Sequence, residues 1–233
     1  MIYFIGEFDG RKFRPEREGV LDRGSCFYAP QAFAGADGRR ILFGWLREET
    51  PLAAVTGRQG ALSLPRVVTL GADGGLRLDP AAEVKLLRRE CVLETSQVIS
   101  PGHPCVTGEL KSAAFEIEVE FENSGGRRFG ARLQGRRSFG GGISIYYDGR
   151  KRGLCVDRAL PGAGNFFAPL DVRRGDILKV RIFVDSSIVE IFAGGRACIA
   201  CRMYPLSLIR PELQFFSEGS SCPLRSVKVH EMG

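Results

Sequence analysis

The stretch Ala113-Ala-Phe-Glu-Ile-Glu-Val-Glu-Phe-Glu122 decides the fold class of this chain. Apolar side chains alternate with glutamates along it, and successive side chains of a β-strand point to opposite faces of a sheet. The alternation therefore predicts an antiparallel strand with one face in the core and the glutamate face toward solvent. It indicates an all-β protein.

Short segments of the same kind surround this strand from Cys91 to the C-terminus. They are rich in β-branched and aromatic residues and end at turn signals such as Asp185-Ser-Ser187 and Gly194-Gly195. About ten short strands over roughly 140 residues predict a two-sheet β-sandwich. Besides 113–122, the expected strands are 128–133, 142–147, 153–156, 177–184, 188–192, 197–203, 212–216 and 224–230.

Short strands are also expected before residue 90. The apolar runs 26–33 and 40–45 flank Gly35-Ala-Asp-Gly38, and Asp-Gly between β-rich runs is typical of a hairpin because glycine accepts the positive φ of the turn. A second hairpin is expected at 67–78. Asp79 and Pro80 then suit the cap and first turn of a short helix that acts as a joint. We place an N-terminal unit at 1–66, a linker at 67–89 and the sandwich at 90–233.

Candidate sugar-binding residues gather around the first hairpin. Asp22 precedes it, Tyr28 lies on its first strand, and Trp45, the only tryptophan of the chain, ends its second strand. An aromatic ring face stacks on a sugar, and a carboxylate accepts hydrogen bonds from its hydroxyl groups. The pattern alone leaves an alternative open. In this alternative, Trp45 is an ordinary core aromatic, as are Phe27, Phe33 and Phe43.

The chain of 233 residues has a formal net charge of +6, which raises the question of nucleic-acid binding. Many basic residues come as doublets at expected turns, for example Arg127-Arg128, Lys151-Arg152 and Arg173-Arg174. No recognition-helix or ribonucleoprotein motif accompanies them, so we interpret them as solvated loop ends and expect no nucleic-acid partner. No apolar run approaches a membrane span and no secretion signal is evident, so no membrane partner is expected.

Seven cysteines are irregularly spaced, and only Cys198 and Cys201 form a C-x-x-C pair. No second pair completes a zinc site, and the two histidines, His103 and His230, lie far away in sequence. Residues three apart on a strand also point to opposite faces. We therefore expect free structural thiols, no metal site and no cofactor. Free thiols favour a reducing compartment, so the cytoplasm is the expected location.

Four segments follow one another in the N-terminal part: Tyr3–Gly10, Leu21–Gln31, Ile41–Trp45 and Gly60–Arg66. They resemble successive motifs of glycoside hydrolase family 32, the β-fructofuranosidases, which include invertases, sucrose-6-phosphate hydrolases, levanases and inulinases. Residues 180–195 and 201–205 are similar to the family's C-terminal signature. The resemblance implies that 1–66 is the last part of a five-bladed β-propeller and that a complete β-sandwich follows.

The resemblance also implies a retaining mechanism. The family's aspartate nucleophile lies in an Asn-Asp-Pro-Asn segment, an Arg-Asp-Pro stretch stabilises the transition state, and a Glu-Cys pair supplies the acid/base glutamate. None of these motifs occurs here in its expected place. Glu90-Cys91 is a literal Glu-Cys pair, but it opens the expected sandwich, and we interpret it as a coincidence. Retention needs two carboxyl groups about 5–5.5 Å apart, so no catalytic residue is assigned.

What carries over from the family pattern is part of a sugar-binding wall. Asp22 matches the acidic residue near the substrate and the acid/base glutamate. Trp45 matches the tryptophan that lines the fructose pocket, and Tyr28 falls on an aromatic of the same wall. Three positions in or next to this wall depart from the family pattern: Arg23 stands where an aromatic is usual, Cys26 where Asp is usual, and Arg58 where Trp is common.

The leading hypothesis is the C-terminal portion of a β-fructofuranosidase-like hydrolase that acts on sucrose or fructans and is inactive alone. A lone propeller blade exposes apolar surface, so we expect an N-terminal propeller segment or a homo-oligomer to cover it.

Two other hypotheses belong to different classes. The first is a non-catalytic carbohydrate-binding or assembly module on the sandwich, with an aromatic face drawn from Phe139, Tyr146, Tyr147, Phe166 and Phe167. The second is an independent hydrolase that uses acidic residues near the N-terminus: Glu7, Asp9, Asp22 or Glu48.

Overall fold

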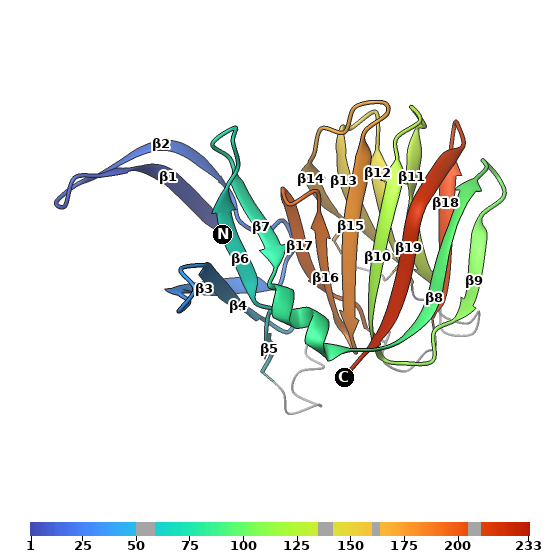
Figure 1. Cartoon of the computed structure of the whole chain (residues 1–233), viewed down its shortest axis with the longest axis horizontal. Coiled ribbons are helices and arrows are strands. Elements are labelled where there is room, and N and C mark those ends of the chain that lie inside the picture. Colours follow the sequence, from blue (N-terminus) through green and yellow to red (C-terminus); the bar gives the residue numbers. More distant parts are fainter. Residues whose placement is uncertain (50–58, 135–141, 160–163, 205–210) are drawn as a thin grey trace.

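The computed structural model describes residues 1–49, 59–134, 142–159, 164–204 and 211–233. These residues form a two-stranded arm at the N-terminus, a small sheet, and a large two-layer sandwich (Figure 1). Within these ranges the helical structure is a short 3-10 helix, η1 (Ala82–Leu87), between the small sheet and the sandwich. The all-β prediction is confirmed.

One layer of the sandwich is a six-stranded antiparallel sheet in the order β17-β16-β15-β10-β19-β8. The alternating stretch forms its strand β10, which pairs with β15 on one side and β19 on the other. The strands are β8 (Arg88–Ile99), β10 (Ala114–Glu122), β15 (Ile177–Asp185), β16 (Ile188–Ala193), β17 (Ala197–Arg202) and β19 (Cys222–Met232).

The second layer is also a six-stranded antiparallel sheet, in the order β14-β13-β12-β11-β18-β9. Between the two layers lies one continuous apolar core, to which β10 contributes Phe115, Ile117 and Val119. The strands of this layer are β9 (Cys105–Glu109), β11 (Arg128–Gln134), β12 (Gly142–Asp148), β13 (Gly153–Arg158), β14 (Phe166–Pro169) and β18 (Glu212–Glu218).

The outer face of β10 differs from the expected row of solvent-facing glutamates. Glu116 is fully buried, with its carboxylate oxygens 2.7 Å from Arg88 Nε and 2.7 Å from Arg181 Nε. A buried carboxylate needs charged, hydrogen-bonding partners, and the aliphatic parts of two arginines can cover it. The alternation therefore identifies the inner face correctly, whereas ion pairs bury part of the outer face.

The small sheet, which we call the blade, has the strand order β3-β4-β6-β7. β3 (Phe27–Ala34) and β4 (Arg40–Leu46) form the expected hairpin, and Gly38 has the positive φ of 81° that the turn requires. β6 (Arg66–Leu70) pairs with β4 and with β7 (Leu76–Pro80), and β5 (Ala61–Leu62) also pairs with β4. The second predicted hairpin therefore continues the blade's sheet through the first part of the segment assigned as a linker.

The helix prediction is wrong at its start. β7 pairs with β6 as far as Pro80, opposite Arg66, so the chain is still extended where Asp79 was expected to cap a helix. Proline is tolerated there because β7 is the edge strand of the blade. η1 begins after Ala81, without a side-chain cap, and runs directly into β8. Among the described residues, no helix has the length and apolar character needed to cross a membrane.

The arm consists of the antiparallel strands β1 (Ile2–Phe8) and β2 (Phe13–Val20) and extends away from the sandwich (Figure 1). In the described ranges, the part before η1 contains this arm and one blade, and no closed propeller.

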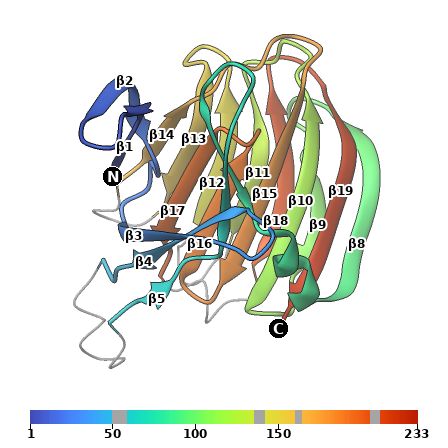
Figure 2. The ribbon, with the colours of Figure 1, turned by 60° about the vertical axis from the view of Figure 1, so that its left-hand side comes forward.

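The blade packs on the outer face of β15, β16 and β17 (Figure 2). Cys198 lies in this interface, whereas Cys201 lies in the sandwich core, which confirms that the two thiols point to opposite faces. All seven cysteines are free, as expected. The main apolar contacts join Leu21, Phe27, Leu46 and Leu78 to Phe183, Phe192, Cys198 and Ala200.

Candidate functional site

The aromatic pair Tyr28 and Trp45 stands on an exposed face of the blade. The two residues are direct cross-strand partners, with ring centroids 6.3 Å apart and ring planes at 67°. Tyr28 is 47% exposed and Trp45 is 40% exposed. The Arg47 guanidinium lies 4.9 Å from the Tyr28 ring centroid, and Trp45 Nε1 donates to the Gln59 carbonyl at 3.0 Å. The pair forms an exposed aromatic surface with the Arg47 guanidinium beside it, and such a surface can stack on a sugar ring.

The core-aromatic alternative applies to part of this group only. Phe27 is buried in the interface with the sandwich. Phe33 and Phe43 stack on each other with ring centroids 6.3 Å apart, and Phe33 is exposed. Trp45 is therefore not a core residue among the described contacts.

Backbone irregularities flank the aromatic pair. The pairing of β3 with β4 shifts between Tyr28 and Gln31, where Ala29 has a φ of 45°. Such bulges re-aim side chains, and a positive φ at a residue other than glycine is strained. On the other side, Gly60 has a φ of 121°, and a Cβ there would lie 2.3 Å from Trp45 Nε1. A glycine is thus required for the chain to lie against the indole ring.

Asp22 is buried in the interface between the blade and the sandwich, whereas the aromatic pair is exposed. Its side chain is 1% exposed. Oδ1 accepts hydrogen bonds from Gly24 N at 2.8 Å and Ala200 N at 2.9 Å, and Oδ2 lies 2.8 Å from Arg66 Nη1. In this structure the carboxylate therefore joins the blade to β17. Its assignment as a sugar-binding group stays a prediction.

Arg66 is the centre of the interface. It is fully buried, and its Nη2 lies 2.8 Å from Glu190 Oε2 of β16, so it bridges carboxylates of both units. Phe27 and Phe192 lie 4.2 and 5.2 Å from its guanidinium carbon. Burial lowers the pKa of a guanidinium, but the ion pairs with Asp22 and Glu190 outweigh it and raise the pKa of Arg66, so the group stays charged.

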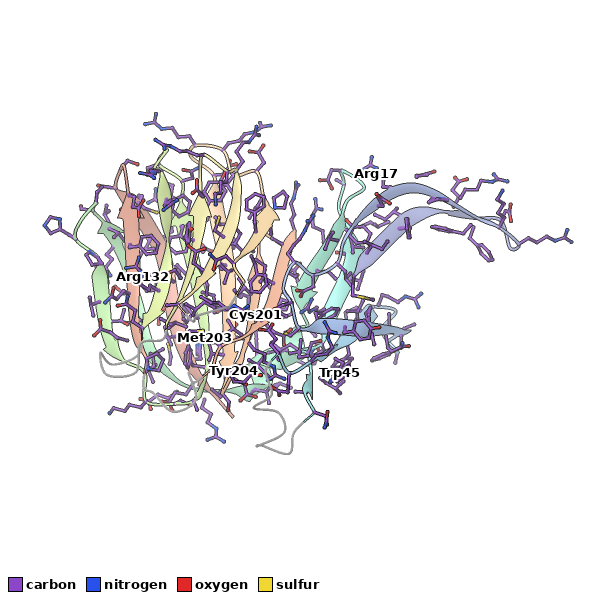
Figure 3. The ribbon with its side chains drawn as sticks, turned by 180° about the vertical axis from the view of Figure 1, so that it is seen from behind. Arg17, Trp45, Arg132, Cys201, Met203 and Tyr204 are labelled. Atoms are coloured by element: carbon purple, nitrogen blue, oxygen red, sulfur yellow. The ribbon has the colours of Figure 1, made fainter. Side chains whose placement is uncertain are left out.

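A second polar cluster holds the segment that follows Trp45. Arg202 of β17 donates from Nη2 to the Leu46 carbonyl at 2.7 Å and from Nε to the Arg47 carbonyl at 3.2 Å, and it pairs with Glu48 at 3.0 Å. Tyr204 donates to the same Glu48 carboxylate. Figure 3 shows Trp45 on the blade and Tyr204 at the neighbouring end of the sandwich. The sandwich thus fixes the backbone beside the aromatic pair.

Sequence reasoning missed Arg66, Glu190 and Arg202 as interface residues. One signal was available: Glu190 is a single carboxylate inside the apolar run Ile188–Phe192, where a buried partner cation is required. The partner Arg66 lies so far away in sequence that no local pattern joins the two.

The three departures from the family pattern lie in different places. Arg23 is exposed and its backbone N donates to the Cys198 carbonyl at 2.9 Å. Cys26 is fully buried in the interface, and burial raises the pKa of its thiol, so it is a neutral packing residue. Arg58 lies outside the described residues.

The acidic residues of the independent-hydrolase hypothesis have structural partners or lie in solvent. Asp9 accepts the backbone N–H groups of Arg11 and Lys12 in the turn of the arm, and Glu7 is exposed on β1. Glu48 pairs with Arg202, as described above. Glu90 lies on β8, at the opposite edge of the sheet from β17. No group of three or more metal-ligating side chains was found in the described part of the chain.

The sandwich aromatics do not form an open platform in the described ranges. Tyr146 and Tyr147 are buried and act as packing residues, and Phe166 is half-buried. Phe167 is exposed, and Phe139 lies outside the described residues. These positions do not favour the carbohydrate-binding module.

The described residues thus form an all-β protein in which one small sheet, with an exposed aromatic pair, packs on a two-sheet sandwich. Two solved structures share this fold. The chain superposes on exo-inulinase from Aspergillus awamori with a TM-score of 0.82 at 22% identity, covering 99% of this chain and 49% of that one. For fructan 1-exohydrolase IIa from Cichorium intybus in complex with 1-kestose, the TM-score is 0.83 at 19% identity, covering 98% and 54%.

Sequence comparison identifies the family. The model "Glycosyl hydrolases family 32 N-terminal domain" matches residues 1–80, and "Glycosyl hydrolases family 32 C terminal" matches residues 83–231. The chain therefore belongs to glycoside hydrolase family 32, as its motifs predicted.

Curated relatives agree with this family. Sucrose-6-phosphate hydrolase from Escherichia coli is 32% identical over 193 residues, which cover 79% of this chain. Levanase from Bacillus subtilis is 29% identical in an alignment 260 residues long that covers all of this chain. The chain spans only 38% and 37% of the lengths of these two relatives.

Proposed function

We propose that this chain is the C-terminal portion of a β-fructofuranosidase-like glycoside hydrolase that cleaves β-fructosidic bonds in sucrose or fructans. The observation that carries the proposal is the exposed aromatic pair on the blade of a family 32 chain, because stacking on a sugar ring needs an accessible aromatic face. Free cysteines agree with a reducing compartment, and we keep the cytoplasm as the proposed location.

The catalytic carboxylates would come from a propeller segment outside residues 1–233. Retaining hydrolysis needs two carboxyl groups flanking the scissile bond, and the family's nucleophile and acid/base motifs do not occur in their expected places in this sequence. Residues 1–233 would then supply one wall of the sugar site and its support on the sandwich. The domain limits belong to the same proposal: pairing of β6 with β4 and of β7 with β6 favours a propeller portion that extends to about residue 80.

The direct test is fructose release from sucrose and inulin by the purified chain. We expect no release from residues 1–233 alone. Release should appear when the chain is joined to, or mixed with, the N-terminal propeller segment of a family 32 enzyme. Turnover by the chain alone, lost on substitution of Glu7, Asp9 or Glu48, would instead support an independent hydrolase.

Sugar binding by the aromatic pair can be measured without catalysis. Because Trp45 is the only tryptophan, its fluorescence reports directly on this site. We expect a fructo-oligosaccharide to change the Trp45 emission, and Tyr28→Ala to weaken binding about tenfold, which corresponds to about 1.4 kcal/mol. The matched control is Phe167→Ala, which removes an exposed aromatic from the sandwich. Equal titration curves for all three proteins would remove Tyr28 from the site.

The apolar surface of the arm and blade predicts an association partner. Exposed apolar side chains on these elements include Ile2, Phe4, Phe8, Phe13, Phe33, Leu62 and Leu70. Apolar side chains concentrated on one part of a protein surface often mark an interface. We expect light scattering to give a mass above the 25.6 kDa of one chain when no propeller segment is present, and Phe4→Ser with Phe8→Ser to restore that mass. A monomer at all concentrations would exclude the homo-oligomer.

A further inference from the structure

Four loops meet at one end of the sandwich, the upper end in Figure 1: 123–127, 149–152, 170–176 and 219–221. The strands that they connect run antiparallel, so segments far apart in the sequence come together there. Three of the basic doublets interpreted above as solvated loop ends, Arg127-Arg128, Lys151-Arg152 and Arg173-Arg174, lie in or beside these loops. We call this end the basic loop end.

The basic loop end contains a concavity of about 560 Å³. Its lining includes four arginines, Arg127, Arg150, Arg152 and Arg174, and one carboxylate, Asp171. Several glycines complete the lining, and the lack of side chains there leaves room for a ligand to approach the backbone.

The positive charge of this concavity is only partly neutralised. Arg152 pairs with Asp171 at 2.8 Å. The nearby Asp148 is already engaged, because its Oδ2 lies 2.8 Å from Arg128 Nε. Among the described residues, Arg127, Arg150 and Arg174 make no ion pair. Three arginines from three different loops therefore line one concavity without a carboxylate partner.

Buried polar groups fix the loops that carry these arginines. Asp148 Oδ1 accepts the backbone N–H groups of Arg150 and Lys151 at 3.0 and 3.2 Å, which sets the shape of the second loop. Asn123 Nδ2 donates to the Val172 carbonyl at 2.8 Å, and the buried Tyr147 hydroxyl lies 3.3 Å from the same oxygen. The concavity therefore has a preformed floor, which reduces the ordering needed when a ligand binds.

We propose that this concavity binds a phosphoryl group, either as inorganic phosphate or as the phosphate ester of a small molecule. Guanidinium groups match the oxygens of a phosphate in geometry and charge, and their hydrogen bonds are stronger than neutral ones. The volume falls in the range of small-molecule sites. This site lies on the sandwich, whereas the aromatic pair lies on the blade, so its test does not depend on the proposed hydrolase function.

The test is a calorimetric titration of the full chain with sodium phosphate at constant ionic strength. The variant Arg150→Gln with Arg174→Gln removes two of the unpaired cations, and we expect it to bind phosphate at least tenfold more weakly. The matched control, Arg11→Gln with Lys12→Gln, removes the same charge from the exposed turn of the arm. Thermal unfolding verifies that each variant folds.

Every outcome decides the proposal. A tenfold loss in the loop variant with an unchanged control supports it. The proposal is overturned if the wild-type chain does not bind phosphate. It is also overturned if both variants lose the same affinity for phosphate, because the binding would then reflect only the net charge of the chain. Fructose 6-phosphate and fructose distinguish the source: tighter binding of the ester than of inorganic phosphate assigns the site to a sugar phosphate. The proposal would also be overturned if a single-stranded oligonucleotide bound more tightly than inorganic phosphate and fructose 6-phosphate, and if the loop variant lost this binding.

Discussion

Arg66→Ala should lower the free energy of unfolding by about 3–5 kcal/mol, because it leaves two buried carboxylates without their shared cation. Asp22 and Glu190 have side chains only 1% and 3% exposed, and neither can turn to solvent without opening the interface. For a chain of this length the midpoint of thermal unfolding should fall by roughly 6–20 °C. Circular dichroism and urea unfolding provide the measurement.

Arg14→Ala is the control for this prediction. Arg14 pairs with Asp9 at 3.1 Å, but the two side chains are largely exposed, and such pairs contribute little to stability. If Arg66→Ala unfolds at the same temperature as Arg14→Ala, the Arg66 ion pairs do not stabilise the interface.

Glu190→Gln tests the same cluster through pH. Burial raises the pKa of Glu190 above its ordinary 4.5, against the opposing ion pair with Arg66 and the Leu64 N–H. A carboxyl group with a higher pKa in the folded state holds its proton more tightly there. Its contribution to stability is therefore complete below pH 4.5 and is lost as the pH rises through the raised pKa. Glutamine does not ionise, so the stability of the variant relative to that of the wild type should rise as the pH increases above 4.5.

Gly24→Ala is expected to destabilise the protein by about 1–3 kcal/mol through a single methyl group. A Cβ at Gly24 would lie 1.8 Å from the Ala200 carbonyl oxygen, and the obstacle is backbone that cannot rotate away. The loop after Asp22 would have to withdraw from β17, which also lengthens the hydrogen bond from Arg23 N to the Cys198 carbonyl. Thermal unfolding and the Trp45 emission spectrum should both change.

Gly164→Ala serves as the matched control, because the nearest atom to a Cβ there is a flexible arginine nitrogen at 3.9 Å. Equal stability of the Gly24 and Gly164 variants would mean that the blade and the sandwich are not in such close contact.

Local patterns predicted the strands well, because periodicity reports the environment of each side chain along one strand. The alternation at 113–122 identified β10, and Asp-Gly identified the turn at Gly38. The aromatic pair followed from the family motifs, and its exposure agrees with a binding role.

Partners distant in the sequence could not be predicted in the same way. The burial of Glu116 depends on Arg88 and Arg181, which are brought over it by other strands. Asp22 can be buried because it pairs with Arg66, and Arg66 can be buried because it also pairs with Glu190. The environment of Asp22 is therefore decided by two residues that are distant from it in the sequence. The basic loop end is similar, since its arginines are separate in the sequence and meet only in the folded sandwich.

The bridge from Asp22 through Arg66 to Glu190 also limits how such a protein can be recombined. A sandwich grafted from a relative without an acidic residue opposite Arg66 would receive a guanidinium with one partner in place of two, in a site closed to water. A blade without the arginine would leave two carboxylates facing each other. The blade and the sandwich are therefore matched to each other through this cluster. A chimaera should take Asp22, Arg66 and Glu190 from the same parent protein.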